Sequence, residues 1–161
     1  MSGSYEQILR EHGPLPVDDV VALGVAAAAA LHAAHQAGRV HGDVRPAMLR
    51  RTGPVVDFGA AQPGELAGVG PAPHASPEAL LGQAQSGLSD VYSLASSLWT
   101  LLTGHPPYLA PGTARPDLAA FRDRVLHEPL PPMPAHVPAW LTAELTRALA
   151  KWPTQRHPSA Q

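Results

Sequence analysis

The sequence predicts a mainly α-helical fold with a few short strands, built as one domain over residues 1–161. The chain has 161 residues and 45% of them are hydrophobic, which suffices for one substantial core. Only 5% are aromatic and alanine is abundant, which favours closely packed helices. The 19 prolines and 14 glycines cluster at 63–77, 104–116 and 129–138, and therefore indicate long loops between the helices.

Two helices are predicted in the N-terminal part of the chain. The first covers Tyr5–Arg10 and is stopped by a Gly-Pro pair. The second is announced by Pro16 and an acidic first turn, and it runs to about Gln36, where Gly38 suits the C-terminal cap. Because the run Val20–Leu31 is apolar, we expect this second helix to be buried.

Short extended segments are expected next. Val40–Leu49 and Pro54–Phe58 carry β-forming residues interrupted by tight-turn signals. The strands should therefore be few and small.

The middle of the chain predicts a short helical turn and then a central helix. The turn covers Pro77–Leu81, and the central helix opens at Ser89 or Asp90 and runs through Leu102. Gly104 and the following proline pair end it. Apolar residues occupy more than one face of this helix, so we expect it to be buried on most sides.

Two amphipathic helices are predicted near the C-terminus, at Asp117–Leu126 and Ala139–Trp152. A proline-rich connector between them should pack as extended chain. Among the tryptophans, Trp99 should lie in the core, and Trp140 and Trp152 should pack the last helices together.

Composition and charge exclude several classes of protein. The net charge is −2 and no basic cluster stands out, so we expect no binding to nucleic acid or to an anionic membrane. The chain has no cysteine and therefore forms no disulfide. The longest apolar run is shorter than the roughly 18 residues of a membrane span, and no signal peptide is recognisable. We therefore expect a cytoplasmic protein with no membrane association.

The histidines of the first third do not form a convincing metal site. His32 and His35 lie on the Ala-rich helix and His41 follows it, with no acidic partner at ligand spacing. We expect no metal ion at these histidines.

Four ordered motifs carry the functional signal. They are HGD at His41–Asp43, DFG at Asp57–Gly59, SPE at Ser76–Glu78, and the long run from Asp90 to Tyr108, with Arg156 following. Their order and spacing resemble protein kinases, nearest to bacterial serine/threonine kinases, over nearly the whole chain. The resemblance implies an α+β protein-kinase-like fold, of which this chain is the helical C-terminal lobe.

The resemblance implies roles for the residues of the two loops. Asp43 corresponds to the catalytic-loop aspartate that accepts the proton of the substrate hydroxyl, with Arg45 in place of the usual lysine. Asp57 would be the principal Mg²⁺ ligand and thereby contact the nucleotide phosphates. His41, and Phe58 and Gly59 of the DFG motif, would be structural.

Three further residues have structural roles by resemblance. Glu78 and Arg156 would form a buried ion pair that anchors the activation segment. Asp90 would hold the backbone of the catalytic loop, besides capping its own helix.

The chain also departs from the family pattern. Met48 stands where the family has an asparagine that binds the second metal ion, and a thioether is a poor Mg²⁺ ligand. Gly42 replaces an arginine that receives activation-loop phosphate, and no Ser, Thr or Tyr lies between Gly59 and Ser76. The threonine and tyrosine of the peptide platform are replaced by Pro71 and His74.

The resemblance begins just after the family's hinge and stops before its last helix. We therefore expect no N-terminal β lobe, which would supply the glycine-rich loop and the nucleotide-binding lysine. Without that lobe we expect binding of ATP and Mg²⁺ to be weak or absent.

Three functional hypotheses follow. The first is a pseudokinase-type regulatory or binding module, inactive alone, whose protein partner binds the face where the N-terminal lobe would sit. The second is an active ATP-dependent serine/threonine protein kinase when an N-terminal lobe is supplied. The third is a non-functional remnant of a kinase gene.

Overall fold

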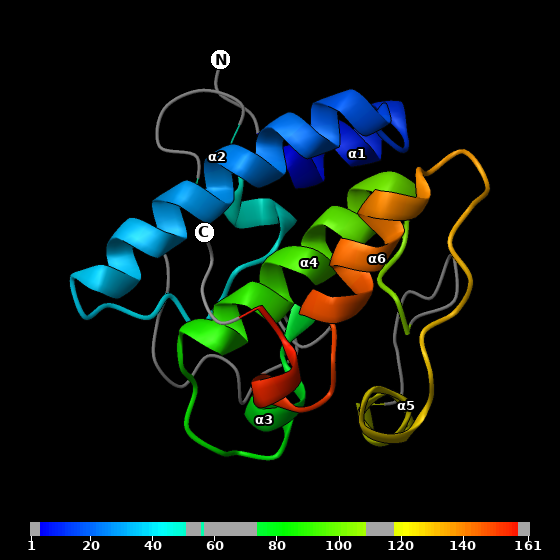
Figure 1. Ribbon diagram of the computed structural model, residues 1–161. Helices are drawn as coiled ribbons and strands as arrows, with labels where there is room; N and C mark the ends of the chain where they lie inside the picture. Colours follow the sequence, from blue (N-terminus) through cyan, green and yellow to red (C-terminus); the bar gives the residue numbers. More distant parts are fainter. Residues whose placement is uncertain (1–3, 51–55, 57–73, 109–117, 158–161) are drawn as a thin grey trace.

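Helices form the regular structure of the computed structural model, which describes residues 4–50, 56, 74–108 and 118–157 (Figure 1). The mainly helical class predicted from the sequence is confirmed. The helices are α1 (Tyr5–His12), α2 (Val17–Gln36), α3 (Pro77–Leu80), α4 (Gly87–Thr103), α5 (Leu118–His127) and α6 (Ala139–Ala148), with 3₁₀ turns η1 (Pro46–Met48) and η4 (Pro153–Gln155).

Helix α4 is the centre of the core. Every residue from Ser89 to Leu102 is buried, and Trp99 is 2% exposed, as predicted. The helix begins earlier than the sequence indicated, because Ser86 is the N-cap: its hydroxyl accepts from the Leu88 N–H, and its own N–H donates to Ser89. Gly104 ends the helix with a φ of +96°, which favours glycine.

Helix α2 packs one face against α4. The buried residues recur at the three- and four-residue spacing of a helix face: Val20, Leu23, Ala27, Leu31 and Ala34. Gly24 allows the close approach, because a Cβ there would lie 3.0 Å from Leu98 Cδ1. Gly38 adopts a φ of +81° just after the helix, in agreement with its predicted capping role.

The prediction that α2 is buried was correct for one face only. By length and apolar composition this helix could span a membrane, and 28% of its most apolar 18-residue window is buried. Its opposite face is exposed and carries Val25, which is 68% accessible.

The segments predicted as short strands form only isolated bridges within the described residues. Ser4 pairs with Arg50 and Leu49 pairs with Val56, both antiparallel. In the first segment η1 interrupts the extended chain, and Pro46 within it has no N–H to donate; of the second segment the structure describes Val56 alone. The bridge at Ser4 places α1 beside η1.

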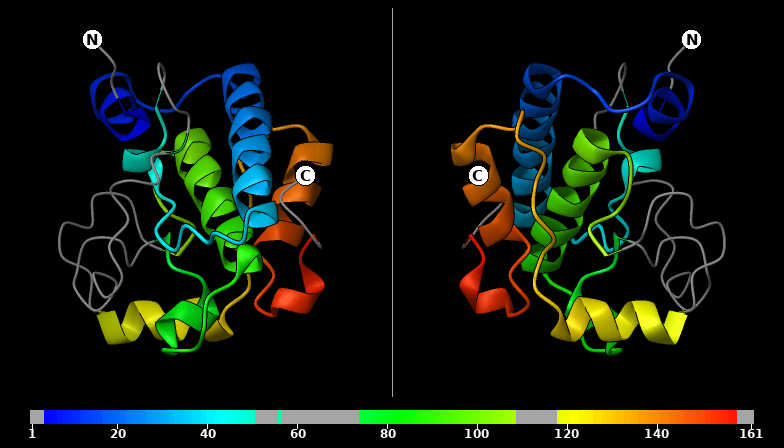
Figure 2. Two further views of the ribbon diagram at one scale, coloured as in Figure 1. Left: turned by 90° about the vertical axis from the view of Figure 1, so that its left-hand side faces the viewer. Right: turned by 90° about the vertical axis from the view of Figure 1, so that its right-hand side faces the viewer.

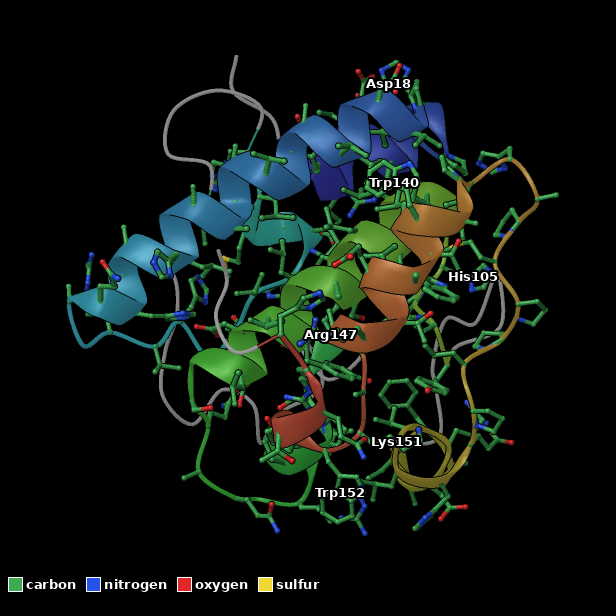
Figure 3. The ribbon with its side chains drawn as sticks, viewed as in Figure 1. Asp18, His105, Trp140, Arg147, Lys151 and Trp152 are labelled. Atoms are coloured by element: carbon green, nitrogen blue, oxygen red, sulfur yellow. The ribbon has the colours of Figure 1, made fainter. Side chains whose placement is uncertain are left out.

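The C-terminal helix is shorter than predicted. Helix α6 ends at Ala148 rather than at Trp152, because the chain turns into η4 and Trp152 precedes Pro153, a position that disfavours helix. The prediction that Trp140 and Trp152 pack the last helices together was wrong, since these side chains are 58% and 68% exposed (Figure 3).

The elements divide around α4 into two opposite sides. Figure 2 shows α1 and η1 together at one side and α6 at the other, with α3 and α5 at one end of α4. The catalytic-loop segment, residues 41–48, therefore lies on the side away from α6.

Candidate functional site

Asp43 is held in a defined position by its neighbours. Its side chain is buried, and Arg45 Nε donates to both carboxylate oxygens, at 3.2 Å and 3.3 Å. The Asp43 N–H donates to His41 Nδ1 at 3.0 Å, which closes a local turn. The residue pair that the resemblance assigns to catalysis is therefore a close ion pair in this chain.

Asp90 supports this loop from α4. Its side chain is 1% exposed and accepts from the His41 N–H at 2.8 Å and from the Gly42 N–H at 2.9 Å. Gly42 has a φ of +81°, which favours glycine. Two backbone donors of the loop thus depend on one buried carboxylate.

His35 is a third donor to the same carboxylate. Its Nε2 lies 2.8 Å from Asp90 Oδ2, so the end of α2 is tied to the start of α4. The ring also lies against Gly87, where a Cβ would come within 2.9 Å of His35 Nδ1. Glycine at this first position of α4 leaves the space that the ring occupies.

Met48 is buried where the resemblance places the second metal ligand. Its side chain is 4% exposed and belongs to the end of η1. A buried thioether does not fit Mg²⁺, which prefers oxygen ligands. Within the described ranges, no group of three or more His, Asp or Glu side chains is arranged to hold a metal ion.

Glu78 and Arg156 form the ion pair that the resemblance implies. The two guanidinium nitrogens donate to the two carboxylate oxygens, each at 2.8 Å, and the Arg156 side chain is inaccessible to solvent. Ser89 Oγ donates to Glu78 Oε2 at 2.8 Å. A bidentate, buried geometry of this kind is the strong form of an ion pair.

The remaining donors of Arg156 are also satisfied. They bond the carbonyl oxygens of Leu88, Ala150 and, at 3.5 Å, Lys151. The guanidinium carbon lies 5.0 Å from the centre of the Tyr92 ring. Burial alone would raise the pKa of Glu78, but hydrogen bonds from Arg156, its own backbone and Ser89 outweigh burial and hold the pKa below its usual range. The pair joins α3, α4 and the C-terminal segment.

His74 is a buried histidine beside the catalytic loop. Its Nδ1 lies 2.9 Å from Ser96 Oγ of α4. Burial, and secondarily the positive charge of Arg45, lower the pKa of His74 to about 3. The imidazole is therefore neutral at physiological pH.

The structure brings together some of the predicted site residues and not others. His41, Asp43, Arg45 and Asp90 form one connected group, and Glu78 with Arg156 forms a second. Asp57, Phe58 and Gly59 lie outside the described residues. Sequence reasoning missed His35, because its acidic partner is 55 positions away, and it missed Ser89 as a partner of Glu78.

Comparison with known proteins identifies the family. The sequence model of the protein kinase domain family matches residues 1–161 of this chain. Serine/threonine-protein kinase PknK of Mycobacterium bovis is 36% identical over 170 residues, covering 98% of this chain and 15% of that protein. Serine/threonine-protein kinase PknB of Mycobacterium leprae is 34% identical over 171 residues, covering 98% of this chain and 27% of that protein.

The chain thus spans about a quarter or less of the length of these curated relatives. The motif order, the Asp90-supported loop and the buried Glu78–Arg156 pair agree with the match over the full sequence. The chain belongs to the protein kinase superfamily, and its relatives are serine/threonine-protein kinases.

Proposed function

We propose that residues 1–161 form a pseudokinase-type binding or regulatory module, which does not transfer phosphate by itself. The observation that carries this proposal is Met48, a buried thioether at the position of the family's second metal ligand. Gly42 and the stretch without Ser, Thr or Tyr between Gly59 and Ser76 point the same way, because both parts of a phosphorylation switch are missing.

Calorimetric titration with Mg²⁺ and ATP tests the proposal. We expect no saturable heat from the wild-type chain, or from Asp57→Ala, in which the predicted remaining metal ligand is removed. Met48→Asn restores an oxygen ligand and Met48→Leu is its matched control, since leucine keeps the volume without adding a ligand. Saturable binding by the wild-type chain that is lost in Asp57→Ala would contradict the weak or absent nucleotide binding that we expect.

A phosphotransfer assay tests the absence of activity directly. With labelled ATP and a mixed pool of serine and threonine peptides, we expect the wild-type chain to incorporate no more label than Asp43→Asn. Incorporation that is abolished by Asp43→Asn would establish catalysis by this chain alone and overturn the proposal.

A second candidate function is an active serine/threonine kinase assembled with a small lobe from elsewhere. Asp43 favours this candidate, because it is retained and positioned by Arg45 and by the Asp90-supported loop. Mixing the chain with a separately expressed small lobe of a relative should then produce label transfer that requires Asp43. Complex formation without transfer would exclude this candidate.

We propose that a protein partner binds the side formed by α1, η1 and the catalytic loop (Figure 2). A photocrosslinking residue at the exposed position Gln7 of α1 should capture this partner. The same probe at the exposed position Arg147 of α6, on the opposite side, is the matched control. Equal capture from both positions would argue against the α1 side as the binding face.

A further inference from the structure

A proline-rich segment joins α5 to α6 at the outer edge of the molecule. It reads EPLPPMPAHVP over residues 128–138, and Figure 1 shows it running from one helix to the other. Residues 129–134 belong to no helix or strand, and every peptide bond of the described residues is trans. The conformation of this segment is therefore set mainly by its own residues.

The prolines restrict the segment to an extended form. Four of the six residues at 129–134 are prolines, and each fixes its φ at about −65°. A proline also disfavours the α region for the residue before it, which applies here to Leu130, Pro131 and Met133. Together these restrictions favour polyproline II, a helix with about three residues per turn.

Burial along the segment follows this three-residue repeat. Leu130 and Met133 are partly buried and pack against the hydrophobic core. Pro129 and Pro132, which precede them by one position each, are both exposed. One edge of the segment is thus anchored to the body of the protein, and the edge formed by Pro129 and Pro132 faces solvent.

The backbone of the segment has free acceptors. Within the described part of the chain, no hydrogen bond is accepted by the carbonyl oxygens of residues 129–133. Exposed proline rings beside free carbonyl oxygens are what an aromatic-lined groove recognises in a polyproline II ligand. The rings of such a groove pack on the prolines, and its Trp N–H and Tyr O–H groups are donors for the carbonyl oxygens.

The segment offers almost no charge to a partner. No Lys or Arg lies between Arg124 and Arg147, and Glu128 and His136 are the titratable residues of 128–138. Recognition would therefore depend on ring packing rather than on ion pairs. Because the prolines and the anchored edge already restrict the segment, binding would order little additional chain, which favours affinity.

We propose that residues 129–134 are a docking segment for a protein with an aromatic-lined groove that binds uncharged polyproline II ligands. The groove covers the edge formed by Pro129 and Pro132, while Leu130 and Met133 stay on the core. This inference goes beyond the proposed function, because the segment is not part of the α1, η1 and catalytic-loop side. It is also separate from His157, which lines a recess between α2 and α6 to which residues 128–138 do not contribute.

NMR titration of two isolated ¹⁵N-labelled domains with such grooves, a WW domain and an SH3 domain, tests the proposal. With the unlabelled full chain we expect saturable shifts at the groove of at least one domain. Pro129→Ala/Pro132→Ala should raise the dissociation constant about tenfold or more, because alanine removes both rings and frees φ. Pro14→Ala, at an exposed proline between α1 and α2, is the matched control and should leave the dissociation constant unchanged.

Circular dichroism melts establish that each variant is folded. Both substituted prolines are exposed, and if the double variant were unfolded, Pro132→Ala alone would serve the same comparison. The absence of saturable shifts in both domains, at chain concentrations up to about 1 mM, would overturn the proposal. A folded proline variant that binds as tightly as the wild type would also overturn it, because the contact would then lie elsewhere on the chain.

Discussion

Breaking the buried ion pair at Arg156 should be among the most destabilising single changes in the described part of the chain. Arg156→Met removes the guanidinium but keeps most of the volume. Glu78, which is 7% exposed in the intact chain, then keeps Ser89 as its side-chain donor. Removing one member of such a pair costs about 3–5 kcal/mol. Against a total stability of about 5–15 kcal/mol for a protein domain, this loss is large.

Urea unfolding followed by circular dichroism measures the loss. With a slope of about 2 kcal/mol per molar urea, the midpoint should fall by about 1.5–2.5 M. The double variant Glu78→Leu/Arg156→Met should be less destabilised than the sum of its two single variants, because neither charge is left buried alone.

The exposed pair Glu6–Arg10 is the matched control. Its atoms are 3.8 Å apart and both side chains are at least half exposed, so Glu6→Gln should change stability by less than about 1 kcal/mol. If Arg156→Met cost no more than Glu6→Gln, the argument that burial makes this pair structurally decisive would be refuted. If Glu78→Leu/Arg156→Met lost as much stability as its two single variants together, the explanation that a buried, unpaired charge causes the loss would be refuted.

Three further perturbations give distinct signatures. His74 is neutral in the folded chain and regains its ordinary pKa of about 6.5 on unfolding, so the unfolded chain takes up a proton as the pH falls. Between pH 7 and pH 5 the free energy of unfolding of the wild type should therefore fall by about 2 kcal/mol more than that of His74→Gln. Equal shifts of the urea midpoint in the two proteins would contradict a buried, neutral imidazole. Asp90→Ala should leave the backbone N–H groups of His41 and Gly42 without their acceptor, which costs about 1–3 kcal/mol of stability for each group. Hydrogen exchange should become faster at these two amides than elsewhere in the loop. A uniform increase across the loop would argue that Asp90 does not hold these two amides. Gly104→Ala should cost about 1 kcal/mol in urea, because its φ of +96° strains any side chain; an unchanged midpoint would count against a left-handed cap.

The elements that depend on local sequence could be predicted well. Helix α4 was recognisable because its apolar residues cover several faces and Gly104 ends it, and α2 was recognisable from Pro16 and the alanine run. The starting residue of α4 was misplaced because Ser86, Ser89 and Asp90 all suit an N-cap, and only the folded chain shows which one caps.

Features that depend on distant partners could not be predicted from residue type alone. The hydrogen bond between His35 and Asp90 could not be foreseen, because 55 positions separate the two residues in the sequence. Trp140 and Trp152 were assigned to packing because tryptophan is large and apolar, but the chain turns away before Trp152 can reach the core. By contrast, Glu78 and Arg156 came from the family resemblance, which carries information about long-range contacts.

The position of Arg156 in the chain also bears on when this protein can become stable during its synthesis. Its partner Glu78 is made 78 residues earlier, so the segment around α3 must wait without its anchor. At about 5–20 residues per second, that wait lasts roughly 4–16 seconds. During this interval the Glu78 carboxylate favours water over the interior, which delays closure of the surrounding core. A nascent chain stalled before residue 156 should therefore be sensitive to proteolysis, while one released with Arg156 should gain its protection late and in a single step.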